Sequence, residues 1–464
     1  MTERRLHVAH GAHDPQGSSA GAPPTFAELG VAAEIVDALA EKDILRPFAI
    51  QEYAVPIALG GQDLIGQART GMGKTLGFGI PVVDRVFDDA TVSAPNGTPR
   101  ALVVVPTREL CLQVTDDIAL AARYATVPVD PNAPGVQTPE GSGEKTRPLS
   151  VLSTYGGVGF DKQVEAIRAG VDIIVGTPGR LLDLSRQKLL DLSTIEIVVL
   201  DEADEMLAQG FLEDVQDILA LTNPQRQTML FSATMPGPIL ALTRTFMNHP
   251  VMIQADNAAT EATHSTTTQI AFQSHKMDRM SALSRILQSP GRGRTIVFAR
   301  TKRQAATVAQ DLAALGFKVG AVHGDMKQPD REISLNEFRT GSIDIMVATD
   351  VAARGIDVDD VTHVINYQVP DDERTYVHRI GRTGRAGHTG TAVSLVGWDE
   401  VQRWNAIDDA LNLNLANPPQ WFSSSPEFLD RFDLPEDITD RVGPRRHVRG
   451  AQSATAPARK RPPR

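Results

Sequence analysis

Short apolar runs, each followed by a polar or Gly/Pro turn and then by a helical pattern, recur along most of this chain. The clearest of them are ALVVVP at 101–106, VDIIVG at 171–176 and IEIVVLDEAD at 195–204. Strands with apolar residues on both faces are buried on both faces, so these runs predict parallel strands covered by helices. The succession predicts a doubly wound parallel α/β sheet, whose binding sites lie at the carboxyl ends of its strands.

A second succession of the same kind follows a polar, Thr- and Ala-rich stretch. Its expected strands lie within RTIVFAR at 294–300, FKVGAVHG at 317–324, IDIMVATD at 343–350 and VTHVINYQ at 361–368. A chain of 464 residues accommodates two or three domains of roughly 150 residues each. We therefore expect two tandem α/β domains, at 25–254 and 269–420, joined by a linker at 255–268.

Three segments lack the pattern of a packed domain. Residues 1–24 are rich in Gly, Pro, Ser and His and are expected to be disordered. Residues 126–147 carry Pro, Gly, Asp and Asn and predict a long exposed loop. An extension at 421–464 ends in a tail, 441–464, with eight Lys or Arg and no acid, which predicts a disordered basic tail that either binds nucleic acid or only aids solubility.

The net charge of -11 argues against a histone-like binder, although it leaves room for a local basic channel. Cys111 is the only cysteine, so no disulfide can form within the chain, and its apolar surroundings predict a buried, inert thiol. No apolar run has the length of a signal peptide core or a membrane span. These features predict a cytoplasmic protein without a membrane partner.

The run ARTGMGKT at 68–75 follows a short apolar run and precedes a helical stretch, which is the context of a phosphate-binding loop. Its backbone N–H groups would wrap the phosphates, Lys74 would neutralise them, and the Thr75 hydroxyl would bind Mg²⁺. The predicted nucleotide-binding residues of this loop are Ala68, Arg69, Thr70, Gly71, Met72, Gly73, Lys74 and Thr75.

An apolar strand that ends in Asp201-Glu202 supplies the expected second half of this site. Asp201 would hold Mg²⁺, directly or through water, and Glu202 would orient and deprotonate the attacking water. Taken alone, the two acids could equally be a solvated strand end.

The run HRIGRTGR at 378–385 places Arg379, Arg382 and Arg385 three residues apart. Residues at this spacing share one helical face, so the three could project together toward a phosphate. A basic, solvated face is the alternative.

The runs ARTGMGKT, PTREL, TPGR, DEAD, SAT, ATDVAARGID and HRIGRTGR occur in that order. Over about 26–396 the chain thereby resembles the bacterial type of DEAD-box ATP-dependent RNA helicases, in superfamily 2. The resemblance implies two RecA-like domains, ATP and Mg²⁺ as cofactors, and single-stranded or short duplex RNA as partner. It also implies RNA-stimulated ATP hydrolysis coupled to local unwinding or remodelling of RNA.

By this resemblance Gln51 reads the adenine edge, Phe26 stacks on adenine, and Asp357 binds the ribose. An amide can both donate to and accept from the purine edge, which would favour ATP over GTP. The region departs from the family pattern, because Asp43-Ile44 stand where Gly-Phe is usual and Phe48 stands where Thr is usual.

The resemblance also assigns coupling and RNA contacts. Ser232 and Thr234 would link the ATP site to RNA through hydrogen bonds with Asp204, Arg382 and Arg385 would be arginine fingers, and His378 and Arg379 would couple them to the DEAD segment. The implied RNA-binding residues are Pro106, Thr107, Arg108, Gly156, Gly157, Thr177, Pro178, Gly179 and Arg180 in the first domain, and Arg300, Gln328, Arg331 and Thr349 in the second.

Two other functions keep much of the same pattern. An ATP-dependent RNA clamp would use the same residues with slow turnover, and a DNA-acting helicase of superfamily 2 would be stimulated by DNA. A P-loop kinase would leave the second domain unexplained. The resemblance makes a monomer the expectation and leaves proteins of ribosome assembly or RNA decay as possible partners.

Overall fold

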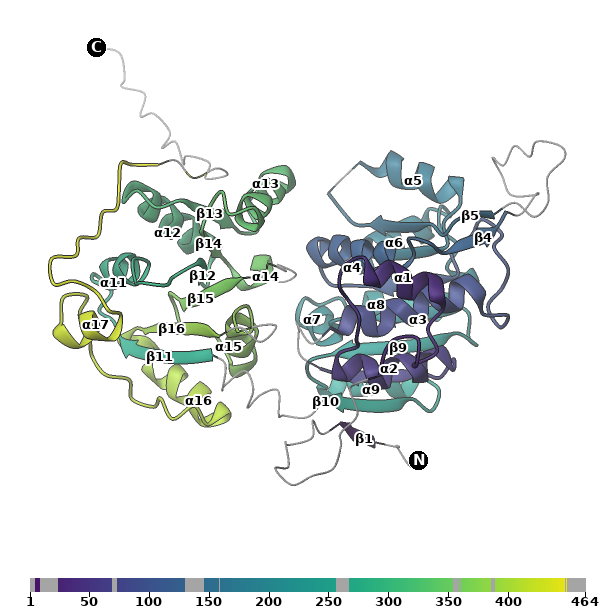
Figure 1. The fold of residues 1–464 in the computed structure, drawn as a ribbon, viewed down its shortest axis with the longest axis horizontal. Coiled ribbons are helices and arrows are strands. Elements are labelled where there is room, and N and C mark those ends of the chain that lie inside the picture. Colours follow the sequence, from purple (N-terminus) through teal and green to yellow (C-terminus); the bar gives the residue numbers. More distant parts are fainter. Residues whose placement is uncertain are drawn as a thin grey trace, which may run out of the picture. The chain divides into compact units, whose positions relative to one another are not determined.

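The computed structural model describes residues 5–8, 24–68, 73–129, 146–157, 159–255, 267–353, 358, 360–384, 389–446 and 448. It divides into two compact units, at Met1–Thr260 and Glu261–Arg464. Each unit is a parallel sheet between helices (Figure 1). Most of the expected linker, at 256–266, lies outside the described residues.

The strands of the first unit form one parallel sheet in the order β1-β10-β2-β9-β8-β3-β7-β6, beside a small antiparallel pair, β4-β5. Its elements are β1 (Arg5–Val8), α1 (Ala33–Ala40), α2 (Ala49–Leu59), β2 (Leu64–Gln67), α3 (Lys74–Asp88), β3 (Ala101–Val104), α4 (Arg108–Ala121), β4 (Thr126–Pro128), β5 (Thr146–Pro148), β6 (Val151–Thr154), α5 (Phe160–Ala169), β7 (Ile173–Gly176), α6 (Pro178–Arg186), η1 (Leu192–Thr194), β8 (Ile197–Leu200), α7 (Ala203–Ala208), α8 (Leu212–Leu221), β9 (Gln227–Ser232), α9 (Gly237–Phe246) and β10 (Val251–Ala255).

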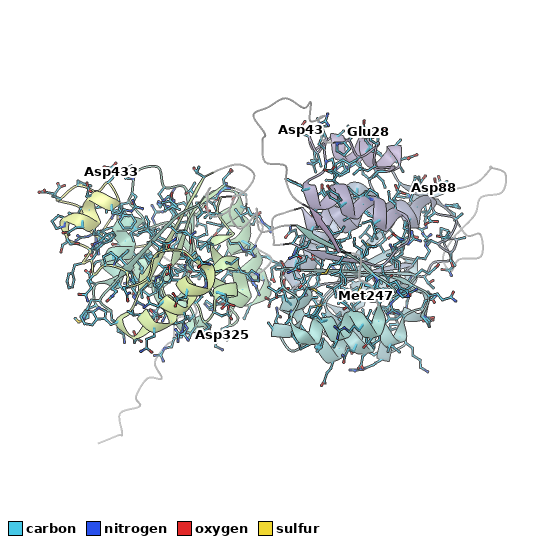
Figure 2. All side chains as sticks on the ribbon, turned by 90° about the horizontal axis from the view of Figure 1, so that it is seen from below. Glu28, Asp43, Asp88, Met247, Asp325 and Asp433 are labelled. Atoms are coloured by element: carbon cyan, nitrogen blue, oxygen red, sulfur yellow. The ribbon has the colours of Figure 1, made fainter. Side chains whose placement is uncertain are left out.

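Alternate residues of β3 show how this sheet is buried on both faces. Ala101 and Val103 pack in a core shared with α1 to α4, while Leu102 and Val104 pack in a core shared with α5, α6, α8 and α9. Side chains fill the space between sheet and helices in each unit (Figure 2). The burial of all four residues explains why the apolar run predicted a two-sided parallel strand.

The second unit has a parallel sheet in the order β11-β16-β15-β12-β14-β13. Its elements are β11 (Thr267–Gln273), α11 (Arg279–Ile286), β12 (Arg294–Phe298), α12 (Lys302–Ala314), β13 (Val319–Val322), α13 (Gln328–Arg339), β14 (Ile345–Ala348), α14 (Asp350–Ala353), β15 (Val361–Asn366), α15 (Glu373–Ile380), β16 (Gly390–Val396), η2 (Trp398–Glu400), α16 (Val401–Leu411) and α17 (Pro426–Arg431). The predicted doubly wound α/β fold is thus confirmed in both units, and each expected strand is present.

Two short segments within the ends expected to be disordered form defined backbone contacts. Arg5–Val8 forms β1, which pairs in parallel with β10 at the edge of the first sheet. Val442 and Gly443 donate backbone hydrogen bonds to Leu315 O, and Arg446 donates to Ala313 O and Gly316 O. We call Val442–Arg446 the strap, because it binds the carbonyl groups of Ala313, Leu315 and Gly316 at and just beyond the C-terminal end of α12.

The chain just before the strap belongs to the core of the second unit. Phe428 and Phe432 pack with Phe272 of β11, and their ring centroids lie 5.6 and 6.2 Å from that of Phe272. The residues after 420 are therefore packed on the second sheet as far as α17, although the sequence placed the domain boundary at that position.

The segment predicted as an exposed loop at 126–147 begins and ends in paired strands. Val127 of β4 pairs with Arg147 of β5, and residues 130–145 lie outside the described residues. Arg147 donates to both carboxylate oxygens of Asp172, at 2.6 and 3.0 Å, and Arg100 donates to the same carboxylate at 2.9 Å. These ion pairs attach the hairpin to the sheet.

Cys111 is buried, and its thiol donates to Val175 O at 3.3 Å. Burial raises the pKa of this thiol to about 12, so the predicted inert cysteine is confirmed. Among the helices of the described residues, none combines the length and the apolarity needed to cross a membrane.

Candidate functional site

The N-terminus of α3 follows β2 at the carboxyl edge of the first sheet, as the phosphate-loop pattern predicts. Gly73 stands at the N-cap with a φ of 76°, a left-handed conformation that favours glycine. Lys74 is 6% exposed, and within the described residues its Nζ has no hydrogen-bond partner. A buried ammonium group is costly without an anion, so its position fits a bound phosphate. Arg69, Thr70, Gly71 and Met72 lie outside the described residues.

Asp201 and Glu202 occupy the end of β8. Asp201 is 2% exposed, and its Oδ1 accepts a hydrogen bond from Glu202 N at 2.9 Å. Burial raises the pKa of Asp201 to about 7, an effect that the charge of Lys74 opposes and that of Glu202 reinforces. The structure thus brings Lys74 and Asp201 within electrostatic reach of each other, as the sequence predicted.

Glu202 has a φ of 52°, a left-handed conformation that is unfavourable for a residue with a side chain. The cost is on the order of 1–3 kcal/mol and is characteristic of functional sites. No residue pattern in the sequence indicates this strain.

The predicted hydrogen bonds between Asp204 and the segment after β9 are present. Oδ2 of Asp204 accepts from Thr234 N at 2.9 Å and from Thr234 Oγ1 at 2.8 Å. Ser232 Oγ accepts from Asp204 N at 3.2 Å and donates to Thr234 O at 2.7 Å. This closed set of bonds fixes the start of α7 to the end of β9.

The expected adenine residues are both buried in this structure. Phe26 is 1% exposed and packs in the core with α1 to α4, so its ring would have to be uncovered before it could stack on a base, and the stacking prediction stays a prediction. Gln51 is also 1% exposed. Its Oε1 accepts from Phe48 N at 2.9 Å, and its Nε2 donates to Gly73 O at 2.7 Å. The Gln51 amide therefore holds the phosphate loop, and it keeps one further donor and one further acceptor position.

The RNA-binding candidates of the first unit gather where β3, β6 and β7 end. Pro106 and Thr107 follow β3, and Thr107 caps α4 by accepting from Leu110 N at 3.3 Å. The guanidinium of Arg108 lies against Gly156 and Gly157, because a Cβ built on Gly157 would be 2.4 Å from Arg108 Nη1.

The neighbouring candidates stand at the end of β7. Thr177 is the N-cap of α6, and Pro178 follows at the first helical position. A side chain on Gly179 would meet nothing within 4 Å, so this turn is open on one side. The Arg180 guanidinium lies 5.1 Å from the centroid of the Phe160 ring. Since neighbouring parallel strands end at one edge, these groups form a basic surface with accessible backbone.

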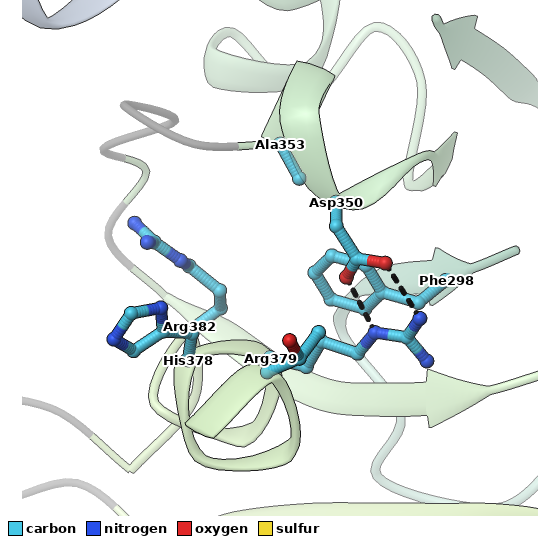
Figure 3. A pocket seen from close by; sticks show the side chains of 7 residues that line it. Phe298, Asp350, Ala353, His378, Arg379 and Arg382 are labelled. Atoms are coloured by element: carbon cyan, nitrogen blue, oxygen red, sulfur yellow. Dashed lines mark hydrogen bonds and ion pairs between the residues drawn. The ribbon is translucent and has the colours of Figure 1, made fainter. Parts of the chain in front are cut away.

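In the second unit the predicted common face of the arginines is wrong. Helix α15 ends at Ile380, before Arg382, so the two arginines do not follow one helical repeat. Arg379 points toward Asp350 and Phe298, whereas His378 and Arg382 point to the other side (Figure 3). Arg385 and Asp357 lie outside the described residues.

Arg379 is 1% exposed and is bound entirely within its own unit. Its Nε and Nη2 donate to the two carboxylate oxygens of Asp350, at 2.6 and 2.8 Å. Its Nη1 donates to Asn366 Oδ1 at 3.0 Å and to Gln368 O at 2.8 Å. Asp350 lies in the run ATDVAARGID, so the sequence marked it as a residue of interest. The sequence alone does not show that its partner is Arg379.

The RNA-binding candidates of the second unit also follow strand ends. Arg300 follows β12 and forms an ion pair with Asp371 at 2.7 Å. Thr349 follows β14 and is 8% exposed. Arg331 of α13 donates to Ala352 O at 3.0 Å. Gln328 is the first residue of α13, and its side chain is outside the described residues.

His323 follows β13 at the same edge of the sheet and was not singled out from the sequence. It is 7% exposed, and neither ring nitrogen has a hydrogen-bond partner among the described residues. Burial lowers its pKa, with Asp325 opposing and Lys302 reinforcing the effect.

Two protein-family models match this chain. "DEAD/DEAH box helicase" matches residues 48–242, and "Helicase conserved C-terminal domain" matches residues 278–387. The chain is 40% identical over 384 residues to the DEAD-box ATP-dependent RNA helicase CshA of Geobacillus kaustophilus, covering 83% of this chain and 76% of that protein. It is 40% identical over 403 residues to the ATP-dependent RNA helicase DeaD of Mycobacterium tuberculosis, covering 86% of this chain and 66% of that protein.

A solved structure of similar fold is Dbp5 of S. cerevisiae bound to RNA and ADP BeF3. It has a TM-score of 0.72 and 26% sequence identity, and the match covers 88% of this chain and 98% of that one.

Proposed function

Because the chain belongs to the DEAD/DEAH box helicase family, we propose that it is an ATP-dependent RNA helicase, which couples RNA-stimulated ATP hydrolysis to local unwinding or remodelling of RNA. The observation that carries this proposal is the first unit's carboxyl edge. It holds the buried pair Lys74 and Asp201 and, on neighbouring strand ends, the basic surface around Arg108 and Arg180.

ATP and Mg²⁺ are the proposed cofactors. The unpartnered Nζ of Lys74 and the buried carboxylate of Asp201 fit a polyphosphate with its cation, since each group would gain an opposite charge. Thr75 and Asp201 would hold the cation, partly through water. When bound, Mg²⁺ would neutralise developing charge on the phosphates.

Within the protein, Glu202 would accept the proton of the attacking water, and Lys74 would stabilise negative charge on the β- and γ-phosphates. Glu202 is held in its left-handed conformation at the N-cap of α7, next to Asp201. Its backbone is thus held beside the residue that would hold the cation.

The second unit would contribute positive charge to the phosphoryl group through Arg382 and Arg385, with His378 beside Arg382 (Figure 3). Asp357 remains the candidate for the ribose. The internal bonds of Arg379 favour a role in holding α15 rather than a direct contact. Loss of RNA-stimulated hydrolysis in Arg382→Ala, with unchanged unfolding, would support the arginine assignment.

RNA would lie along the carboxyl edges of the sheets. Arg108, Arg180 and Arg300 would meet phosphates, while the open turn at Gly179 would let backbone approach the strand. Asp204 follows Asp201 and Glu202 of the nucleotide site, and its bonds to Thr234 connect this segment to the end of β9. We propose that these bonds couple the nucleotide site to the RNA surface.

The test is steady-state ATP hydrolysis without nucleic acid, with single-stranded RNA, and with DNA of matched sequence. Stimulation by RNA alone is expected. Equal stimulation by DNA would favour a DNA-acting helicase, and slow turnover with long residence on RNA would favour an RNA clamp. A Lys74→Met variant serves as the control, because it should abolish the hydrolysis in every case.

We further propose a cytoplasmic protein that acts as a monomer, with proteins of ribosome assembly or RNA decay as candidate partners. Light scattering of the purified chain at several concentrations would test the monomer. A mass that rises with concentration would contradict it.

A further inference from the structure

Phe48 occupies a position for which its side chain is poorly suited. It is the N-cap of α2, with an extended conformation and no side-chain capping hydrogen bond. Serine, threonine, aspartate and asparagine are preferred at this position because their oxygens accept from the first turn of the helix. A phenyl ring cannot do so, and this ring is 57% exposed. Phe48 thus gives up a capping hydrogen bond and also exposes an apolar ring to solvent. Both costs would be offset if the ring contacted a ligand.

The ring lies against the residue that precedes Lys74. A Cβ built on Gly73 would be 2.6 Å from Phe48 Cδ2 and 2.5 Å from Gln51 Nε2. Phe48 and Gln51 together therefore cover the end of the phosphate loop, and the Gln51 amide also accepts from Phe48 N. Only glycine permits this close approach.

The other aromatic residues of this region are less suitable for contact with a nucleotide base. Phe26 is buried in the core. Tyr124 is 45% exposed, but its hydroxyl is bonded to Glu41. Tyr53 is 37% exposed and lies on α2. It is not among the residues nearest to Gly73, where the closest atoms belong to Phe48 and Gln51.

We propose that the Phe48 ring stacks on the base of the bound nucleotide and so supplies an aromatic contact that Phe26, buried in this structure, does not offer. The proposal rests on the proposed function of Lys74 and the α3 N-terminus as the phosphate site. Stacking of a base on an aromatic ring accepts any base, because every base has a π face. Phe48 therefore adds affinity for nucleotides in general, and discrimination between adenine and guanine is left to groups such as Gln51.

The experiment measures equilibrium binding to the full chain by displacement of fluorescent ADP. The competitors are ADP, GDP and tripolyphosphate, which has no base. Phe48→Leu is expected to weaken ADP and GDP by a similar factor of roughly tenfold and to leave tripolyphosphate unchanged. Phe48→Trp should retain wild-type affinity, and Tyr53→Leu is the matched control, since it removes an exposed aromatic ring from the same helix.

Unchanged ADP affinity in Phe48→Leu would refute the proposal. An equal change for ADP and tripolyphosphate would also refute it, because the ring would then act on the phosphate loop. If Lys74→Met left tripolyphosphate binding intact, the phosphate site itself would be misplaced, which is a separate failure. Phe48→Thr guards against misfolding, since threonine is the better cap and should not lower the melting temperature.

Discussion

Replacement of Arg379 by alanine should unfold the second unit far more easily and should leave the first unit intact. Arg379 makes two charged bonds to Asp350, one to Asn366 and one to the carbonyl of Gln368, and its guanidinium lies 5.2 Å from the Phe298 ring centroid. Breaking a buried ion pair by removal of one partner costs about 3–5 kcal/mol. Because the Asp350 side chain keeps 24% exposure, part of its charge would be solvated. We therefore expect a loss of about 3–4 kcal/mol in the free energy of unfolding.

Tryptophan fluorescence during urea unfolding measures this loss directly. The chain has three tryptophans, Trp398, Trp404 and Trp421, and all belong to the second unit, so their signal reports that unit alone. Arg303→Ala is the control, because Arg303 is an exposed arginine on α12 and its loss should cost under about 0.5 kcal/mol. An Arg379→Ala midpoint equal to that of the control would refute the reasoning. If the midpoint stayed equal to that of the control while RNA-stimulated hydrolysis was lost, Arg379 would instead be a coupling residue.

Three other outcomes follow from the structure. Burial lowers the pKa of His363 to about 4 from an ordinary value of 6.5, so between these values the unfolded chain binds a proton that the folded chain does not. The contribution of His363 to the free energy of unfolding is therefore full above about pH 6.5 and falls by at most about 3 kcal/mol as the pH drops to about 4. The variant His363→Gln should flatten this pH dependence, measured by urea unfolding with tryptophan fluorescence. An unchanged slope would contradict the prediction. Asp204→Ala should reduce RNA stimulation of ATP hydrolysis at least tenfold, roughly the loss of one to two charged bonds, with ADP binding retained; full stimulation would remove the coupling role. Truncation after Val448 should leave the unfolding midpoint unchanged and weaken RNA binding at low salt. Truncation after Asp440 should also lower the unfolding midpoint, because it deletes Arg446 and the rest of the strap. Equal midpoints for the two truncated chains would contradict the role of the strap.

The elements that could be predicted from sequence are those whose burial is uniform. A central strand such as β8 is buried at every residue, and burial on both faces imposes an apolar run that is visible without coordinates. The residues that follow such strands, including Asp201 and Thr349, could be placed at the carboxyl edge for the same reason.

The rest depended on contacts between distant parts of the chain. Arg379 and Arg382 differ in direction because α15 ends between them, and Phe26 is removed from solvent by helices that come later in the sequence. Glu202 adopts its conformation because the chain must turn between β8 and α7. Local pattern contains no information on these tertiary constraints.

The strap fixes the position at which the chain leaves the second unit after Arg446. It binds Leu315 and Gly316, which lie between the end of α12 and the start of β13, at the amino edge of the second sheet. The candidate ligands meet the opposite, carboxyl edge. A surface anchor or fluorophore joined after Val448 would therefore start from the far side of this unit, which makes it a suitable handle for watching single molecules while the carboxyl edge stays open to nucleic acid.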